Sequence, residues 1–368
     1  MSWVIEREHL EGASRVVGRH ALRTALVPAA PLGPNVWLKL ESEQKTGSFK
    51  VRGALARLAA LSAAERERGV VAASAGNHGL GVAFAARTLG IEARVFVPRD
   101  APMVKREGIA RYGARVEVMD EPGYDAAERR ALAAVVNTGE VFVSPYDDPW
   151  VAAGNGGTLA AEVFGQLTDV GAFVLPVGGG GLLAGIAAAA CHMGKRAALI
   201  GVQSEASPAM TRSLADGKAY QTWDSDPTFA EGLEGGVTAG SVARAKAAGV
   251  QMHLVSEAAI AEALRFAGAT LGHRIEGSAA VTIAHLMANP PSGEGATVVV
   301  ITGKNVDRRV WRAVMAGESD PLRARSAGAD PDPRLAPSDR AAELTEESRD
   351  GSEPPSGSER ASGAEGGD

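Results

Sequence analysis

The sequence has little of what several classes of protein depend on. It contains one cysteine, Cys191, in 368 residues, which excludes an internal disulfide framework and a cysteine-rich zinc site. Aromatic residues make up 5% of the chain, whereas 45% is hydrophobic, a composition typical of α/β proteins rather than β-sandwiches. No apolar run reaches the roughly 18 residues of a membrane span, and the start, MSWVIEREHL, lacks the apolar run of a signal peptide. The sequence therefore predicts a soluble, cytoplasmic protein.

The net charge of −6 is unevenly distributed along the chain. From Gly317 onward there are 13 acidic and 6 basic residues, a net of −7, so the preceding residues carry about +1. There is no basic domain of the kind that binds nucleic acid. Residues 317–368 are rich in Gly, Ser, Pro and charge, and cannot bury enough apolar surface to offset the entropy of ordering. We predict a disordered acidic tail over 317–368.

Helical and extended patterns alternate along most of the chain. A first series has predicted strands at 70–74, 93–98, 114–119 and 140–146 and helices at 51–68, 79–90, 104–113 and 125–139. A second has strands at 172–177, 198–203 and 296–302 and helices at 157–167 and 182–194. This alternation indicates two open α/β units with parallel sheets, divided near Pro145–Pro149. Because ligands bind at the carboxyl ends of such strands, the strand-to-helix turns are where chemistry is expected.

Four consecutive glycines, Gly178 to Gly181, join a predicted strand to a predicted helix in LPVGGGGLLAGIA. Glycine lets successive backbone N–H groups converge without Cβ clashes, and the helix N-terminus adds its dipole. We interpret the run as an anion-binding nest suited to a phosphate. A flexible connection is the alternative, but four glycines make it costly in backbone entropy. The run does not fit GxxxxGK[ST], so a nucleoside triphosphate is not indicated.

Two further turns carry polar groups that suit other parts of a ligand. In ASAGNHGLG, Ala73 to Gly81, backbone N–H groups can bind a carboxylate and the Asn77 amide can donate to a phenolate-like oxygen. A helix cap by Ser74 or Asn77 explains that segment equally well. In ITGKNVD, the Thr302 hydroxyl can bond a heterocyclic nitrogen. A plain strand-ending turn is at least as good an interpretation there.

Lys50 closes the stretch KTGSFK, immediately before the apolar residues of a predicted helix. One interpretation is a surface lysine in a loop, and the other is an amine nucleophile held out of water. A phosphate nest, a donor for a ring hydroxyl, a hydroxyl for a ring nitrogen and an imine-forming amine together match pyridoxal 5′-phosphate. The sequence therefore predicts this cofactor, with Lys50 forming the imine and Phe49 packing beside the ring.

The motifs, taken in order, resemble those of the threonine/serine dehydratases, which are fold-type II pyridoxal-phosphate enzymes of the tryptophan synthase β-like superfamily. The segments that carry the resemblance are KLESEQKTGSFKVRGA, ASAGNHGLGVAFAA, LPVGGGGLLAGIAAA, GVQSE and ITGKNVD, within roughly residues 15–310. The resemblance implies two open parallel-sheet α/β domains with the cofactor in the cleft between them. It implies a large domain of residues 1–50 and 147–316, a small domain of residues 51–146, and a homodimer.

Matching the motifs residue by residue assigns expected roles. The resemblance makes Lys50 the catalytic Schiff-base lysine and lets Asn77 contact the phenolic oxygen of the cofactor and Thr302 its pyridine nitrogen. The residues expected to hold the phosphate are Gly178, Gly179, Gly180 and Gly181, and Leu182 is also expected to contact the cofactor. Those expected to bind the substrate are Ser74, Ala75, Gly76, Asn77 and His78. The reaction implied is dehydration and deamination of an L-β-hydroxy amino acid, such as threonine or serine, to a 2-oxo acid and ammonia.

Several positions depart from the family pattern. The family commonly has Gln at Leu80 and Ser at Thr302, and AGNGGT at 153–158 is one residue longer than its AGQGT. The segment RIEGSAAVTIA departs from its usual Glu-Pro-Ala-Gly form. Gln203 replaces the carboxylate of a cation site found in some members, so no metal is expected.

Other functions remain open at this stage. A β-replacing synthase or an amino-acid racemase would use the same cofactor, and a non-catalytic metabolite-binding relative or a dinucleotide-dependent oxidoreductase belongs to a different class. Serine racemases carry a Ser where this chain has Ala75, a side chain with no transferable proton. Elimination is therefore expected over racemisation.

Overall fold

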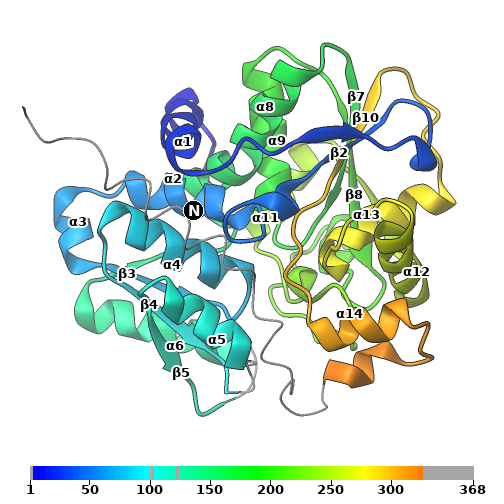
Figure 1. Ribbon diagram of the computed structural model, residues 1–368. Helices are drawn as coiled ribbons and strands as arrows, with labels where there is room; N and C mark the ends of the chain where they lie inside the picture. The colour runs from blue at the N-terminus through cyan, green and yellow to red at the C-terminus, as the bar shows by residue number, and fades with distance from the viewer. Residues whose placement is uncertain (1–2, 100, 102, 122–123, 326–368) are drawn as a thin grey trace, which may run out of the picture. The chain divides into compact units, whose positions relative to one another are not determined.

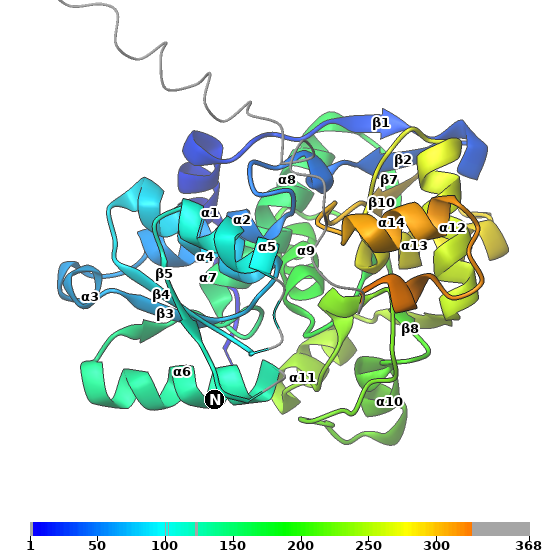
Figure 2. The same ribbon diagram turned by 60° about the horizontal axis from the view of Figure 1, so that its bottom comes forward.

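The computed structural model describes residues 3–99, 101, 103–121 and 124–325, and its two sheets are seen in Figures 1 and 2. The larger sheet has six strands in the order β1-β2-β10-β7-β8-β9. Its strands are β1 Leu26–Pro28, β2 Val36–Lys39, β10 Ala296–Val300, β7 Val170–Pro176, β8 Ala198–Ser204 and β9 Gln251–Val255. All neighbours pair in parallel except β1 and β2, which are antiparallel.

The smaller sheet has four parallel strands in the order β5-β4-β3-β6. Its strands are β5 Arg115–Val118, β4 Ala93–Val97, β3 Val70–Ala73 and β6 Val141–Phe142. Helices α2, α4 and α5 pack on one face of this sheet and α6 on the other, as Figure 2 shows. Two parallel-sheet α/β units confirm the predicted fold class.

The helices between the strands follow in chain order. The α-helices are α1 Arg7–His20, α2 Lys50–Ala59, α3 Ala63–Arg68, α4 Asn77–Leu89, α5 Met103–Arg111, α6 Tyr124–Thr138, α7 Pro149–Ala152, α8 Thr158–Gln166, α9 Gly181–His192, α10 Ala209–Asp216, α11 Ala239–Ala247, α12 Glu257–Ala269, α13 Gly277–Ala288 and α14 Arg308–Met315. The 3-10 helices are η1 Ala30–Leu32, η2 Glu41–Glu43, η4 Glu231–Leu233 and η5 Pro321–Arg325, and η3, Ala153–Gly157, is a π-helix. Among the residues described, no helix is long and apolar enough to cross a membrane.

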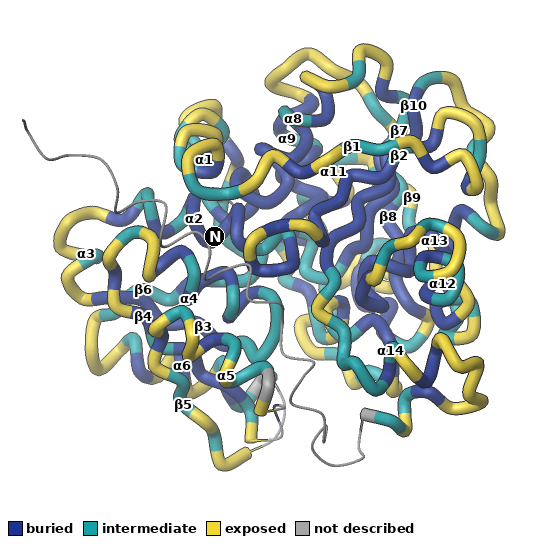
Figure 3. The backbone as a smooth tube through the Cα atoms, viewed as in Figure 1, coloured by how far each residue is buried: buried dark blue, intermediate teal, exposed yellow. Residues whose placement is uncertain are grey.

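Alternate residues of the large sheet's central strands enter two different cores. Val299 of β10 and Val174 of β7 pack with α12 and α13, whereas Val298 and Phe173 pack with α8 and α9. Successive side chains of a strand point to opposite faces, so both faces of this sheet are apolar and covered. This burial is why β10 has the continuous apolar sequence ATVVV, and Figure 3 shows these strands in dark blue.

The single helix predicted over residues 51–68 is wrong. The chain forms α2 and α3 with a break at residues 60–62. Ser62 accepts a hydrogen bond from the backbone N–H of Glu65, and the Glu65 carboxylate accepts one from the backbone of Ser62. This capping box begins a new helix, so local hydrogen bonding overrides the continuous pattern.

The described chain continues beyond α14 through η5 to Arg325. Leu322 of η5 packs against the core that contains α12 and α13. The remainder of the predicted acidic tail, residues 326–368, lies outside the described residues.

Candidate active site

Lys50 is the first residue of α2. Its Nζ atom donates a hydrogen bond to the carbonyl of Pro145, 2.9 Å away, in the segment that links β6 to α7. The same atom lies 5.3 Å from the centre of the Phe49 ring. Burial lowers the pKa of Lys50 to about 8, although the negative charge of Glu276 opposes this shift. The structure thus presents an amine that sheds its proton far more readily than an ordinary lysine.

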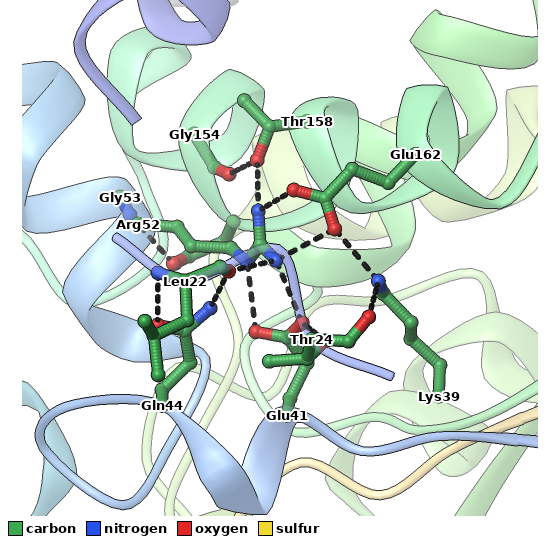
Figure 4. Close-up of polar contacts among 11 residues, drawn as sticks. Leu22, Thr24, Lys39, Glu41, Gln44, Arg52, Gly53, Gly154, Thr158 and Glu162 are labelled. Atoms are coloured by element: carbon green, nitrogen blue, oxygen red, sulfur yellow. Dashed lines mark hydrogen bonds and ion pairs between the residues drawn. The ribbon is translucent and has the colours of Figure 1, made fainter. Parts of the chain in front are cut away.

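A buried ionic network fixes the start of α2, as Figure 4 shows. Arg52 donates to both carboxylate oxygens of Glu41, at 2.7 and 2.8 Å, and to both of Glu162, at 2.7 and 2.9 Å. Lys39 of β2 also contacts Glu162, at 2.6 Å. Two cations therefore balance two carboxylates, which is the condition under which buried charges are tolerated. The network joins α2 to β2, η2 and α8, and so holds the helix that carries Lys50.

The π-helix η3 links α2 to α9. The Asn155 side chain of η3 accepts a hydrogen bond of 2.8 Å from the backbone N–H of Gly53 in α2. On the other side, a Cβ atom on Gly156 would lie 2.1 Å from the carbonyl oxygen of Leu182, and one on Gly185 would lie 2.1 Å from that of Ala152. Only glycine permits this backbone-to-backbone approach. The helix of Lys50 and the helix that follows the glycine run are thereby held by one element.

The glycine run forms a closely packed turn into α9. Gly180 is the N-cap of α9 and has a left-handed backbone, with φ of 85°. A Cβ on Gly179 would lie 2.2 Å from the Cγ of Tyr146, whose ring covers this turn. Leu182 is buried behind it. The turn therefore ends at a free helix N-terminus, with no room for side chains at its centre, which is the arrangement that binds a phosphate.

The loop 74–78 leads into the N-terminus of α4. Ser74 Oγ accepts a hydrogen bond of 3.0 Å from the N–H of Gly76, and Ala75 packs against the small-sheet core. His78 is buried, and its Nε2 lies 2.8 Å from the carbonyl oxygen of Val143. Burial, together with the charge of Lys50, lowers the pKa of His78 to about 3. The His78 ring is therefore neutral, and the N–H groups of the first turn of α4 are left without partners inside the helix, as at every helix N-terminus.

Asn77 contacts a residue that sequence reasoning missed. Its Nδ2 atom lies 2.9 Å from both carboxylate oxygens of Glu276, the N-cap residue of α13. Its Oδ1 accepts a hydrogen bond of 2.7 Å from Asn305. The Glu276 carboxyl group is buried, and burial raises its pKa. The only signal in the sequence was RIEGSAAVTIA, which we noted as a departure without assigning Glu276 a role.

Thr302 follows β10 beside the segment that ends in Lys50. Its carbonyl accepts a hydrogen bond of 3.0 Å from the N–H of Phe49, and its side chain is buried. The next residue, Gly303, forms an isolated antiparallel bridge with Ser48. A Cβ on Gly303 would meet the Glu276 carboxylate at 2.5 Å. The contacts therefore connect Thr302, Phe49 and the Asn77–Glu276 pair.

These contacts form a continuous set around Lys50. Pro145 accepts from Lys50, and the next residue, Tyr146, covers the glycine turn. On the other side, Thr302 is bonded to Phe49, and Asn77 reaches Glu276 beside Gly303. An amine of lowered pKa, a side-chain-free turn at a helix N-terminus and an amide donor fit the imine, phosphate and ring-oxygen groups of pyridoxal 5′-phosphate.

Comparison with known proteins identifies the family. The family described as "Pyridoxal-phosphate dependent enzyme" matches residues 14–303. The chain belongs to this family. An L-threonine ammonia-lyase of Thermotoga maritima is 39% identical over 312 residues, which cover 83% of this chain and 76% of the relative.

Solved structures of the family have the same fold. The processed form of threonine deaminase isoform 2 from Solanum lycopersicum matches with a TM-score of 0.77 and 31% identity, covering 84% of this chain and 88% of that one. Maize serine racemase matches with a TM-score of 0.77 and 25% identity, covering 86% and 98%. The predicted membership in the threonine/serine dehydratases and the predicted cofactor are confirmed: this protein is a pyridoxal-phosphate-dependent lyase.

Gln203 lies at the position where some family members have the carboxylate of a cation site, and its side chain has hydrogen-bond partners within the chain. Its Nε2 donates to the carbonyl of Ser207 at 3.3 Å, and its Oε1 accepts from the N–H and the hydroxyl of Thr211, each at 2.9 Å. Within the described part of the chain, no group of three or more His, Cys, Asp and Glu side chains is arranged to hold a metal ion.

Proposed function

We propose that this enzyme catalyses β-elimination of an L-β-hydroxy amino acid, threonine or serine, and releases a 2-oxo acid and ammonia. The observation that carries the proposal is Lys50, an amine with a pKa of about 8 that is bonded to Pro145, the residue before the tyrosine that covers the glycine turn. The relatives support the reaction type, because the Thermotoga maritima relative is an L-threonine ammonia-lyase and the tomato structure is a threonine deaminase.

Each of the site residues has a separate role in the proposed reaction. When bound, the cofactor supplies the electron withdrawal that makes the α-proton of the amino acid acidic. Lys50, once its amine is free, takes that proton, which requires the lowered pKa that burial provides. The N–H groups of Ser74 and Gly76 are bonded to Phe96 and to Ser74 Oγ, so those of Asn77 and His78, at the start of α4, would hold the substrate carboxylate. The Thr302 hydroxyl would bond the pyridine nitrogen of the cofactor without giving it a full charge, and an uncharged ring would favour prompt loss of the β-hydroxyl of the substrate.

A 2-oxo acid assay with a panel of β-hydroxy amino acids tests the proposal. L-threonine, L-serine, a hydroxyaspartate and a bulkier β-hydroxy amino acid are compared, with L-alanine as the matched substrate that has no leaving group. We expect a 2-oxo acid and ammonia in equal amounts from L-threonine or L-serine. Formation of neither product from any member of the panel by the cofactor-loaded protein would contradict the proposal.

A racemase is the second candidate, because maize serine racemase has the same fold. Racemisation needs a second proton donor on the cofactor face opposite the lysine. At the position of Ala75 the side chain is a methyl group, and the neighbouring Ser74 hydroxyl accepts from Gly76. Elimination is therefore the favoured outcome.

We further propose a cytoplasmic homodimer, as the family resemblance implies. Analytical ultracentrifugation of the holoenzyme at several concentrations tests the assembly. Sedimentation as a monomer throughout would reject the dimer, whereas fractionation of cells from the native host tests the location.

A further inference from the structure

The hydrogen bonds around Asn77 fix which end of its amide faces Glu276. Asn305 bonds the backbone carbonyl of Thr46 at 2.8 Å, and a carbonyl can only accept, so the bonding atom is the Asn305 Nδ2. This same Nδ2 lies 2.7 Å from the Asn77 side chain, which must accept with its Oδ1. The Asn77 Nδ2 therefore points at Glu276, and its two hydrogens are the donors left for a ligand.

Glu276 is held tightly in this place. Its backbone N–H donates to the carbonyl of Gly303 at 3.0 Å, and its carboxylate packs where a Cβ of Gly303 would lie. The charged groups that face it are Lys50 of α2, Lys105 of α5 and Glu231 of η4, the last two joined at 2.8 Å. No cation within hydrogen-bond distance of the Glu276 carboxylate is found among the described residues, and its partners are the Asn77 amide and the backbone N–H of Asn305.

We propose that Glu276 is a positioning residue that aims the Asn77 amide at the ring oxygen of the cofactor and takes up a proton when that oxygen binds. The proposal rests on the proposed function, in which Asn77 contacts the phenolic oxygen. Glu276 makes no contact with substrate in this scheme. It acts through Asn77, and Asn305 acts in the same way from the other end of the amide.

The proton uptake follows from the two negative charges that would lie next to the Asn77 amide. A bound phenolate and the Glu276 carboxylate would share the Asn77 Nδ2, and two negative charges this close together raise the pKa of the carboxyl group further. Burial already favours the neutral form of Glu276, since its pKa is raised. The carboxyl group therefore binds one proton as the ligand arrives, and ligand affinity must fall as pH rises above the pKa of Glu276.

The test uses pyridoxine 5′-phosphate, which has the ring hydroxyl and the phosphate but no aldehyde, so that Lys50 cannot attach to it. Its 3-deoxy analogue, without the ring oxygen, is the matched probe. The dissociation constants of both are measured by isothermal titration calorimetry in buffers of different ionisation enthalpy, from mildly acidic pH up to the pKa of Lys50, about 8. The heat difference between buffers counts the protons taken up.

Compared with Glu276→Gln, which keeps the shape but not the titration, the wild type should take up close to one more proton with the 3-hydroxy probe and little more with the 3-deoxy probe. This comparison cancels the protons that the ring nitrogen and the phosphate exchange in both proteins. Relative to Glu276→Gln, wild-type affinity for the 3-hydroxy probe should fall about tenfold per pH unit above the pKa of Glu276. The control Glu231→Gln removes a more distant charge and should keep both.

The outcomes separate this inference from the proposed function. Equal proton uptake in the wild type and Glu276→Gln overturns the role of Glu276, as does an extra uptake by the wild type that is the same with both probes. Failure of the wild type to bind either probe would instead contradict the assignment of the glycine turn. Asn305→Ala gives a second check, because it frees the Asn77 amide to turn and should weaken the 3-hydroxy probe at least tenfold more than the 3-deoxy probe.

Discussion

The amine of Lys50 donates to the carbonyl of Pro145 across 2.9 Å, so the reactive group rests against the segment that connects the two sheets. A main-chain carbonyl accepts from a neutral amine as well as from a charged one. The bond thus orients Lys50 without restoring its charge, whereas a carboxylate in the same place would raise the pKa of the amine. The hydrogen bond to Pro145 therefore sets the position of the Lys50 amine, whereas burial lowers its pKa.

The first prediction concerns the pH dependence of cofactor attachment. The neutral amine is the form that reacts, so the second-order rate at which pyridoxal 5′-phosphate attaches to the apoprotein should rise with pH and level off near the Lys50 pKa of about 8. Stopped-flow absorbance measures this rate. Glu276→Gln should move the plateau to lower pH, because the charge of Glu276 raises the pKa of Lys50. A rate still rising at pH 10 would contradict the burial of the amine.

The site of attachment is checked by borohydride reduction followed by peptide mass spectrometry. The pyridoxyl group should be found on Lys50, and Lys50→Ala should carry none. Recovery of the label on another lysine in the wild type would show that the nucleophile has been misassigned.

The second prediction concerns the buried network. Arg52→Met leaves Glu41 and Glu162 with one cation, Lys39, so we expect a loss of about 3–5 kcal/mol of unfolding free energy. Urea denaturation measures this loss. The control is Arg129→Met, whose ion pair with Glu121 is exposed and should cost less than about 1 kcal/mol. Similar costs for the two variants would show that the network does not hold α2.

The third prediction concerns the glycine turn. In Gly179→Ala the new Cβ would lie 2.2 Å from the ring of Tyr146, so either the turn or the ring must move. We expect cofactor affinity to fall at least tenfold, measured by equilibrium dialysis of the holoenzyme. The matched control is Gly18→Ala in α1, where nothing lies within 4 Å of the added Cβ. An undiminished affinity in Gly179→Ala would argue against a phosphate at this turn.

The fourth prediction separates elimination from racemisation. The wild type should form little D-amino acid, because position 75 has no transferable proton. Ala75→Ser places a hydroxyl there and should give measurable racemisation. Chiral chromatography of the unreacted substrate measures both. D-amino acid accumulating in the wild type as fast as the 2-oxo acid would place the enzyme among the racemases.

Much of the central sheet structure could be predicted because buried parallel strands are continuous apolar runs. The strand predicted at 70–74 is β3, Val70–Ala73, and the one at 296–302 contains β10. The edge strand β1 and its neighbour β2 went unpredicted, and β1 has only three residues and ends in Pro28. Strand β9 was not predicted either, because most of its residues are exposed and it lacks an apolar run.

The site residues also differ in how well the sequence predicts them. The glycine run and Lys50 belong to local motifs that can be recognised, so both could be named from the sequence, although their roles stay predictions. Glu276 could not, because it reaches Asn77 across 199 residues of chain and nothing near it indicates that contact. Arg52 stands within an apolar helix, and only the structure shows the two carboxylates that allow its burial.

The π-helix η3 contains most of the segment AGNGGT. AGNGGT has one residue more than the AGQGT of the family, and one added residue would turn all that follows in an α-helix by about 100°. A π turn takes up a single extra residue locally. Thr158 and Glu162, one turn apart on α8, consequently both face Arg52. The π turn thus lets the chain hold one more residue beside the active site without breaking the ionic network that holds the helix of Lys50.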